Sequence, residues 1–153
     1  NEEINQNLKE KFLDNKVKAE QIHILNFQKD NFDHLSFYND IDIALDTFPY
    51  NGVTTTFESI LMGVPVLTIK GFNFNSRCGE SINKNLKLEN FIAENYNDYY
   101  LKALDLYKNI NYLKSLRKEL RNKAISSPLF DNKNFASIFS KKIKTIWENF
   151  IKG

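Results

Sequence analysis

Three consecutive threonines follow an Asn-Gly pair near the middle of the chain, and their spacing suits the binding of an anion. Asn51 and Gly52 come just after an apolar run, and Thr54, Thr55 and Thr56 open a helical pattern. The first backbone N–H groups of a helix lack partners within the helix and lie at the positive end of its dipole. Gly52 lets a ligand approach the backbone closely, and threonine hydroxyls add hydrogen bonds without adding charge. The pattern predicts a site for a phosphate or a diphosphate.

The same threonines have a plainer interpretation, in which one of them caps the helix and the others only fill its first turn. The residue types alone support these two interpretations equally. The stretch contains neither the Gly-Lys-Ser/Thr of a Walker loop nor the Gly-x-Gly-x-x-Gly of a dinucleotide-binding loop. Neither of these two well-known phosphate motifs therefore accounts for it.

Two further side chains have the chemistry to complete a nucleotide site. Glu58 lies four residues after Thr54, on the same face of the predicted helix, where its carboxylate can accept hydrogen bonds from ribose hydroxyls. Its alternative role is only to complement the helix N-terminus. His34 follows a predicted strand and either stacks on a base or is an ordinary surface residue. The sequence shows no acid–base pair, nucleophile triad or metal cluster, and we interpret Asp42 and Asp46 as residues at the ends of a strand.

A strand–loop–helix–strand unit must position these side chains. We predict a strand at Asp42–Asp46, buried between helix layers, and a helix at Thr54–Met62 that ends at Gly63. Pro65–Ile69 is predicted to be the following strand, with proline tolerated as its first residue. Two shorter stretches also carry strand-forming residues, namely Gln21–Phe27 and Phe91–Ala93.

Helical spacing of apolar residues accounts for most of the remaining chain. The expected helices cover residues 1–13, 31–38, 76–86, 98–107, 111–124 and 135–151. Helices that alternate with strands are typical of the α/β class, so we predict a Rossmann-like parallel sheet with helices on both faces. Ligands of such sheets bind at the carboxyl ends of the strands, which is where the threonines are placed.

Composition restricts the class of protein. The 153 residues are 42% hydrophobic and 26% charged with a net charge of +2, which argues against a dedicated nucleic-acid surface and a membrane span. Cys78 is the single cysteine, so an internal disulfide is excluded and a metal site is disfavoured. The free thiol and the polar, acidic N-terminus predict a cytoplasmic protein without a signal peptide. Because the chain begins with Asn1 rather than Met, we expect it to be a piece of a longer protein.

Three segments resemble the C-terminal catalytic lobe of the nucleocytoplasmic protein O-glycosyltransferases, the family of the O-linked N-acetylglucosamine transferases and the Spindly-type O-fucosyltransferases. The segments are DIALDTFPYNGVTTTFESILMGVPVLTIKG (42–71), NSRCGESI (75–82) and ISSPLFDNKNF (125–135). The resemblance implies the two-lobed glycosyltransferase fold called GT-B. Residues 1–153 would form part of a single nucleotide-sugar-binding lobe, with a terminal crossover helix at residues 133–151. It also implies parts outside this sequence: helical repeats and an N-terminal lobe with the family's proposed catalytic histidine.

The resemblance further implies roles for single residues. Thr54 and Thr55 match positions that bind the donor diphosphate, and Glu58 matches an acidic residue on the ribose. Gln28 matches a residue that meets the edge of the base through its backbone, and His34 matches one that stacks on the base.

Two positions depart from the animal N-acetylglucosamine enzymes. Val53 stands where those enzymes carry a histidine beside the phosphates, and Phe37 stands where they carry an arginine near the base. The resemblance favours UDP-N-acetylglucosamine (UDP-GlcNAc) as the donor and keeps GDP-fucose as the alternative.

We therefore predict the donor-binding part of a protein O-glycosyltransferase that transfers a sugar, N-acetylglucosamine or fucose, from a nucleoside diphosphate to a protein Ser or Thr. The prediction includes no metal or other cofactor and no catalytic residue within this chain, which alone is expected to be inactive. Its predicted partners are the acceptor protein and the N-terminal lobe. The alternative is a non-catalytic module that binds a nucleotide or a protein. We also expect the apolar stripe at residues 135–150 to be exposed and to cause self-association.

Overall fold

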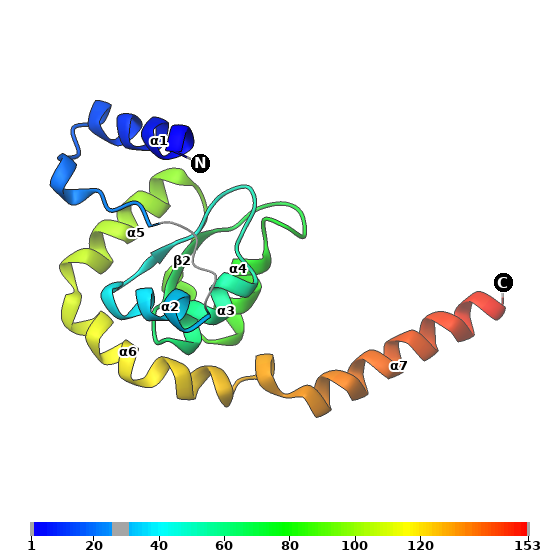
Figure 1. The fold of residues 1–153 in the computed structure, drawn as a ribbon. Helices are drawn as coiled ribbons and strands as arrows, with labels where there is room; N and C mark the ends of the chain where they lie inside the picture. The colour runs from blue at the N-terminus through cyan, green and yellow to red at the C-terminus, as the bar shows by residue number, and fades with distance from the viewer. Residues whose placement is uncertain (1, 26–30, 153) are drawn as a thin grey trace. The chain divides into compact units, whose positions relative to one another are not determined.

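The chain divides into two compact units, Asn1–His34 and Leu35–Gly153. The structure is a computed structural model, and it describes residues 2–25 and 31–152. Figure 1 shows the ribbon with its helices and strands labelled. That the whole chain forms a single nucleotide-sugar-binding lobe stays a prediction.

The first unit is built around helix α1, Glu2–Asp14. Glu2 and Glu3 lie in its first turn, where they complement the helix dipole, and the expected N-terminal helix is confirmed. A single 3-10 turn, η1 (Ala19–Gln21), follows it. The strand predicted at Gln21–Phe27 is wrong for residues 22–25, which pair with none of the described strands. Ile22 has extended backbone angles, but an extended segment becomes a strand only when a neighbour supplies its hydrogen bonds.

The second unit contains a three-stranded parallel sheet in the described part of the chain. Its strands are β1 (Ala44–Leu45), β2 (Val66–Ile69) and β3 (Ile92–Ala93), in the order β1-β2-β3. All four residues of the central strand β2 are buried, so both faces of the sheet are covered there. The predicted burial of the first strand is wrong, because Leu45 is 58% exposed. As an edge strand, β1 has a described neighbour on one side only.

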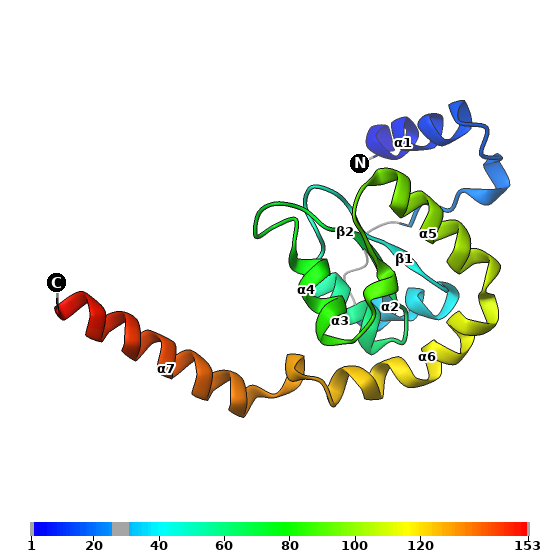
Figure 2. The same cartoon turned by 180° about the vertical axis from the view of Figure 1, so that it is seen from behind.

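Helices cover the sheet on both faces, as predicted. The crossover helices α3 (Thr54–Leu61) and α4 (Cys78–Asn85) connect β1 to β2 and β2 to β3, and both pack against β2. Helix α5, Tyr96–Lys108, packs against β2 and β3. Figures 1 and 2 show α5 on one side of β2 and the α3–α4 pair on the other. This arrangement aims the loops at the carboxyl ends of the strands toward a common edge.

A turn with left-handed backbone ends α3. Gly63 has a φ of 82°, and its N–H bonds to the carbonyl of Ile60 at 3.0 Å. A side chain at this position would also meet the backbone oxygen of Arg117, because a Cβ there would lie 2.8 Å from it. Glycine is therefore required here both by conformation and by the close approach of helix α6, Ile110–Ile125.

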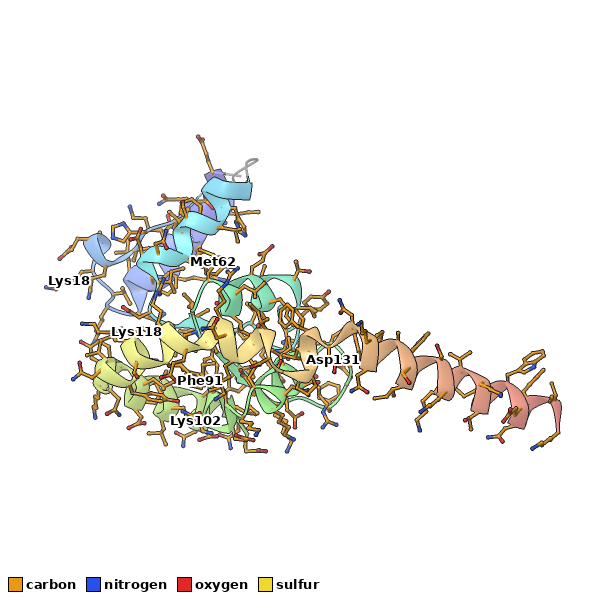
Figure 3. All side chains as sticks on the ribbon, turned by 90° about the horizontal axis from the view of Figure 1, so that it is seen from below. Lys18, Met62, Phe91, Lys102, Lys118 and Asp131 are labelled. Atoms are coloured by element: carbon orange, nitrogen blue, oxygen red, sulfur yellow. The ribbon has the colours of Figure 1, made fainter. Side chains whose placement is uncertain are left out.

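The core lies between the sheet and the helices. Helix α6 contributes a buried stripe at helical spacing, consisting of Leu113, Leu116, Leu120 and Ala124. Phe91 is fully buried in the same cluster and is labelled in Figure 3. Phe91 ends a 3-10 turn, η3 (Glu89–Phe91), directly before β3. Burial of apolar surface on this scale gives the site a rigid support.

The last helix, α7 (Asn132–Ile151), has no buried residue. It follows the turn η4, Pro128–Phe130, and Asp131 caps it by accepting a hydrogen bond from the N–H of Asn134 at 3.0 Å. Its apolar stripe is exposed as predicted, with each of these side chains at least half exposed: Phe135, Ile138, Phe139, Ile143, Ile146, Trp147 and Phe150. Figure 3 shows the side chains along this helix beyond Asp131. Among the described residues, no helix combines the length and apolar character needed to cross a lipid bilayer.

Candidate functional site

The start of α3 lies directly after the loop that leaves the carboxyl end of β1. Val53 is the residue at the N-cap position, and no side chain makes a capping hydrogen bond there in the described structure. Thr54 and Thr55 are both exposed. The first backbone N–H groups of a helix then meet solvent together with two hydroxyls, an arrangement that suits an anion. The structure therefore places these two threonines where the sequence predicted them.

A cavity of about 220 Å³ adjoins this helix start. Polar groups of the loop and the helix line part of it, including Thr47, Gly52, Thr55 and Tyr38. A larger cavity of about 540 Å³ lies beside Val53, but its lining is mostly apolar and includes Phe57, Phe72 and Phe74. Because an ionised phosphate needs hydrogen-bond donors when it leaves water, the smaller cavity is the better match for a diphosphate.

Asn51 and Thr56 use their polar groups inside the protein. The Asn51 side chain is 1% exposed; its amide donates to the carbonyl of Thr47 at 3.0 Å and its carbonyl accepts from the N–H of Gly79 at 3.3 Å. The Thr56 hydroxyl is likewise buried and donates to the carbonyl of Gly52 at 2.8 Å. These two predicted site residues therefore stabilise the loop and the first turn of α3 through hydrogen bonds inside the protein. Gly52, which was also predicted to belong to the site, is half-buried and borders the cavity.

Tyr38 bonds to Thr55 and is close enough to Glu58 for the charge of that residue to affect it. Its hydroxyl donates to the backbone oxygen of Thr55 at 3.3 Å. Burial, and after it the negative charge of Glu58, raise the pKa of Tyr38. Glu58 is half-buried and lies four residues after Thr54, on the same face of α3, although it does not line the cavity of about 220 Å³. Tyr38 was not predicted from the sequence, since it is separated from α3 by the whole of β1.

The two residues predicted to meet the base belong to other parts of the chain. His34 is half-buried in helix α2, Asn31–Ser36, and is the last residue of the first unit, whereas the threonines belong to the second. Gln28 lies outside the described residues. Phe37 opens a 3-10 turn, η2 (Phe37–Asp40), in the second unit and is half-buried. The roles of Gln28 and His34 on a base stay predictions.

Asp46 borders the cavity and makes contacts that its sequence position did not predict. It was interpreted as the end of a strand, yet its carboxylate accepts hydrogen bonds from the N–H of Gly52 at 2.8 Å and from the Thr68 hydroxyl at 2.8 Å. Burial, partly offset by these hydrogen bonds, raises its pKa. The sequence did contain a signal for this role. Asp46 lies at the carboxyl end of a strand and before a loop with Pro and Gly, and a carboxylate there can accept hydrogen bonds from the N–H groups of its own loop.

Comparison with known proteins agrees with this architecture. Residues 3–139 match the family model described as Glycosyl transferase family 41. The chain is 38% identical over 123 residues to a protein of Solanum lycopersicum named probable UDP-N-acetylglucosamine–peptide N-acetylglucosaminyltransferase SPINDLY. That match covers 80% of this chain and 13% of the relative. The protein of the same name from Arabidopsis thaliana is 33% identical over 137 residues, which is 90% of this chain and 15% of the relative.

A solved structure has the same fold. A mutant O-GlcNAc transferase of Thermobaculum terrenum superposes with a TM-score of 0.85 and 30% sequence identity, covering 94% of this chain and 28% of that one. The predicted α/β class and the lobe of a two-lobed GT-B glycosyltransferase are thereby confirmed. Since the family model spans nearly the whole sequence, this chain belongs to glycosyl transferase family 41.

Proposed function

We propose that this chain is the donor-binding part of a protein O-glycosyltransferase, and that it holds a nucleoside diphosphate sugar at the start of α3. In this proposal Thr54 and Thr55 bind the diphosphate through their backbone N–H groups and hydroxyls. Glu58 accepts hydrogen bonds from the ribose, His34 stacks on the base, and the backbone of Gln28 meets the edge of the base. Gly52 gives the ligand room, and Asn51 and Thr56 hold the loop in shape.

The observation that carries the proposal is the uncapped start of α3 with its two exposed threonines. A diphosphate gains negative charge as the bond to its sugar breaks. Hydrogen-bond donors already fixed in place stabilise that charge without reorganising, and such preorganised electrostatic stabilisation is often a large part of catalysis. The helix dipole adds a positive potential at the same point, so the proposed site needs no metal ion.

The acceptor in this proposal is a Ser or Thr hydroxyl of another protein, which attacks the anomeric carbon of the sugar directly. The base for that step would come from the N-terminal lobe, which is also the proposed intramolecular partner of this chain. UDP-N-acetylglucosamine is the proposed donor, because the similar proteins carry names that specify it. GDP-fucose is the second candidate, since Val53 and Phe37 replace the two polar residues of the animal enzymes. We also propose a cytoplasmic location, based on the single free cysteine.

Isothermal titration calorimetry of the 153-residue chain with UDP and with GDP tests the proposal. We expect one of the two nucleotides to bind and the Thr54→Ala/Thr55→Ala double variant to lose that binding. Thr145→Ala is the matched control, because its hydroxyl donates to the carbonyl of Lys141 in α7 and lies on another element. Preference for UDP supports the N-acetylglucosamine donor, and preference for GDP supports fucose. If the intact chain binds neither nucleotide, a non-catalytic protein-binding module becomes the better explanation.

A further inference from the structure

Asp46 directly follows β1 and makes hydrogen bonds to β2, to α5 and to the loop before α3. Its backbone N–H bonds to the carbonyl of Leu67 in β2 at 2.9 Å. Its backbone oxygen accepts a hydrogen bond from the Tyr99 hydroxyl of α5 at 3.0 Å. Hydrogen bonds from β2 and α5 therefore fix the main chain of Asp46, and with it the position of its Cα.

The two carboxylate oxygens of Asp46 are used for different purposes. Oδ1 accepts from the N–H of Thr47 at 3.0 Å and from the N–H of Gly52 at 2.8 Å, so it closes the loop between β1 and α3 on itself. Oδ2 accepts from the Thr68 hydroxyl at 2.8 Å and so fixes the closed loop to the central strand. Thr68 is fully buried, so the donor of this bond is shielded from water, whereas the acceptor Asp46 is half-buried.

Two glycines surround this carboxylate where a side chain would not fit. A Cβ on Gly79 of α4 would lie 2.8 Å from Oδ2 of Asp46 and 2.4 Å from the Thr68 hydroxyl oxygen. A Cβ on Gly52 would lie 2.5 Å from the hydroxyl oxygen of Thr55. The backbone of α4 thus approaches the Asp46 carboxylate closely, and the Gly52 backbone lies between this carboxylate and the Thr55 hydroxyl.

We propose that Asp46 is a positioning residue for nucleoside diphosphate binding: its carboxylate sets the path of the loop and thereby the orientation of the N–H groups and hydroxyls of Thr54 and Thr55. This inference rests on the function proposed above. Asp46 is among the residues that line the cavity of about 220 Å³, but both of its carboxylate oxygens already accept hydrogen bonds within the protein, and a carboxylate does not bind a diphosphate. In this proposal the diphosphate therefore binds the N–H groups and hydroxyls further along α3. Its contribution is the geometry of its acceptor oxygens, so a neutral side chain of the same shape replaces it.

Calorimetric titration of three proteins with UDP and GDP separates this inference from the proposed function. Asp46→Ala is expected to weaken binding of the preferred nucleotide by about tenfold or more. Asp46→Asn keeps an oxygen that accepts from Gly52 and Thr47 and an amide that donates to Thr68, so we expect affinity close to that of the unaltered chain. Asn83→Ala is the matched control: Asn83 is fully buried and donates to the carbonyls of Val66 and Phe91, away from the loop.

Each outcome decides one point. Equal affinity in Asp46→Ala and the unaltered chain overturns the positioning role, and so does an Asp46→Asn variant as weak as Asp46→Ala. Loss of affinity in Asn83→Ala that matches Asp46→Ala attributes the effect to general destabilisation and also overturns it. If Asp46→Ala does not fold, Thr68→Val replaces it, since this change removes only the bond to Oδ2 and is expected to give a smaller loss of affinity. Absence of nucleotide binding by the unaltered chain rejects the proposed function instead.

Discussion

The side-chain carbonyl of Asn51 accepts a hydrogen bond from the backbone N–H of Gly79, 3.3 Å away, and so the loop before α3 caps the start of α4. The two residues are 28 positions apart in the sequence. Asn51 also donates to the carbonyl of Thr47 within its own loop. One buried amide therefore links the loop before α3 to the start of α4.

Replacing Asn51 with alanine is expected to lower the free energy of unfolding by about 1–3 kcal/mol, because the carbonyl of Thr47 and the N–H of the buried Gly79 lose their partner. Chemical denaturation followed by circular dichroism measures this change. Asn85→Ala is the control, since the Asn85 side chain bonds the carbonyl of Ser81 at the exposed surface of α4. A similar loss in both variants would contradict the capping role of Asn51.

Asp46 predicts a pH dependence of stability. Its pKa is raised above the ordinary value of 3.8, chiefly by burial, so the folded chain binds this proton more tightly than the unfolded chain does. The stabilising contribution is complete below pH 3.8 and is lost as the pH rises through the folded-state pKa. We expect Asp46→Asn to be at least as stable as the unaltered chain at neutral pH and to lack this dependence.

Urea denaturation at several pH values between acid and neutral conditions measures the effect at Asp46. Asp46→Ala serves as the comparison, and we expect it to be less stable by about 1–3 kcal/mol at neutral pH, because two loop N–H groups lose their acceptor. Equal stability of the asparagine and alanine variants at neutral pH would show that these hydrogen bonds contribute nothing.

Gly63→Ala tests the left-handed turn that ends α3. Two features oppose a side chain there: the φ of 82°, and the backbone oxygen of Arg117, which would lie 2.8 Å from an added Cβ. We expect a loss of about 1–3 kcal/mol in unfolding free energy, measured by thermal or chemical denaturation. Lys87 has a φ of 54° after α4 and offers the reverse change, because Lys87→Gly relieves the same type of backbone strain. A destabilising Lys87→Gly together with a neutral Gly63→Ala would refute the argument.

The exposed stripe of α7 predicts self-association of the isolated chain. Ile143 and Trp147 are 50% and 60% exposed, and apolar side chains at this spacing normally lie against a partner. Sedimentation velocity over a range of concentrations should show association that the Ile143→Ser/Trp147→Ser variant lacks. Lys141→Ser/Lys144→Ser alters the charged face and is the control. A strictly monomeric unaltered chain would contradict this expectation.

Much of the fold was accessible from the sequence because its local signals are strong. The helix at Thr54–Leu61, its glycine stop and the strand at Val66–Ile69 agree with the prediction to within one residue at each end. The terminal helix, Asn132–Ile151, ends at the predicted residue, since its apolar period runs along most of its length. Periodicity and turn residues act locally, so these elements can be located without tertiary information.

Features that depend on distant residues could not be predicted in the same way. Strand-forming residues at 22–25 suggested a strand, but strand formation depends on a pairing partner that the pattern does not specify. Leu45 was expected to be buried, and its exposure follows from the edge position of β1. In the candidate site, the position of the exposed threonines could be predicted, because they directly follow a strand and a loop and open a helix. The roles of Asp46 and Asn51 depend on Thr68 and Gly79, which lie more than twenty residues away.

The most direct test of the proposed donor site is a nuclear magnetic resonance titration of the ¹⁵N-labelled chain with UDP and GDP. The account predicts that the preferred nucleotide shifts the backbone amide signals of Thr54 and Thr55 most strongly, because their N–H groups bind the diphosphate. The Gly52 amide should move less, since Asp46 already accepts its hydrogen bond. Saturable shifts confined to residues outside the start of α3, or no shifts with either nucleotide, would contradict the account.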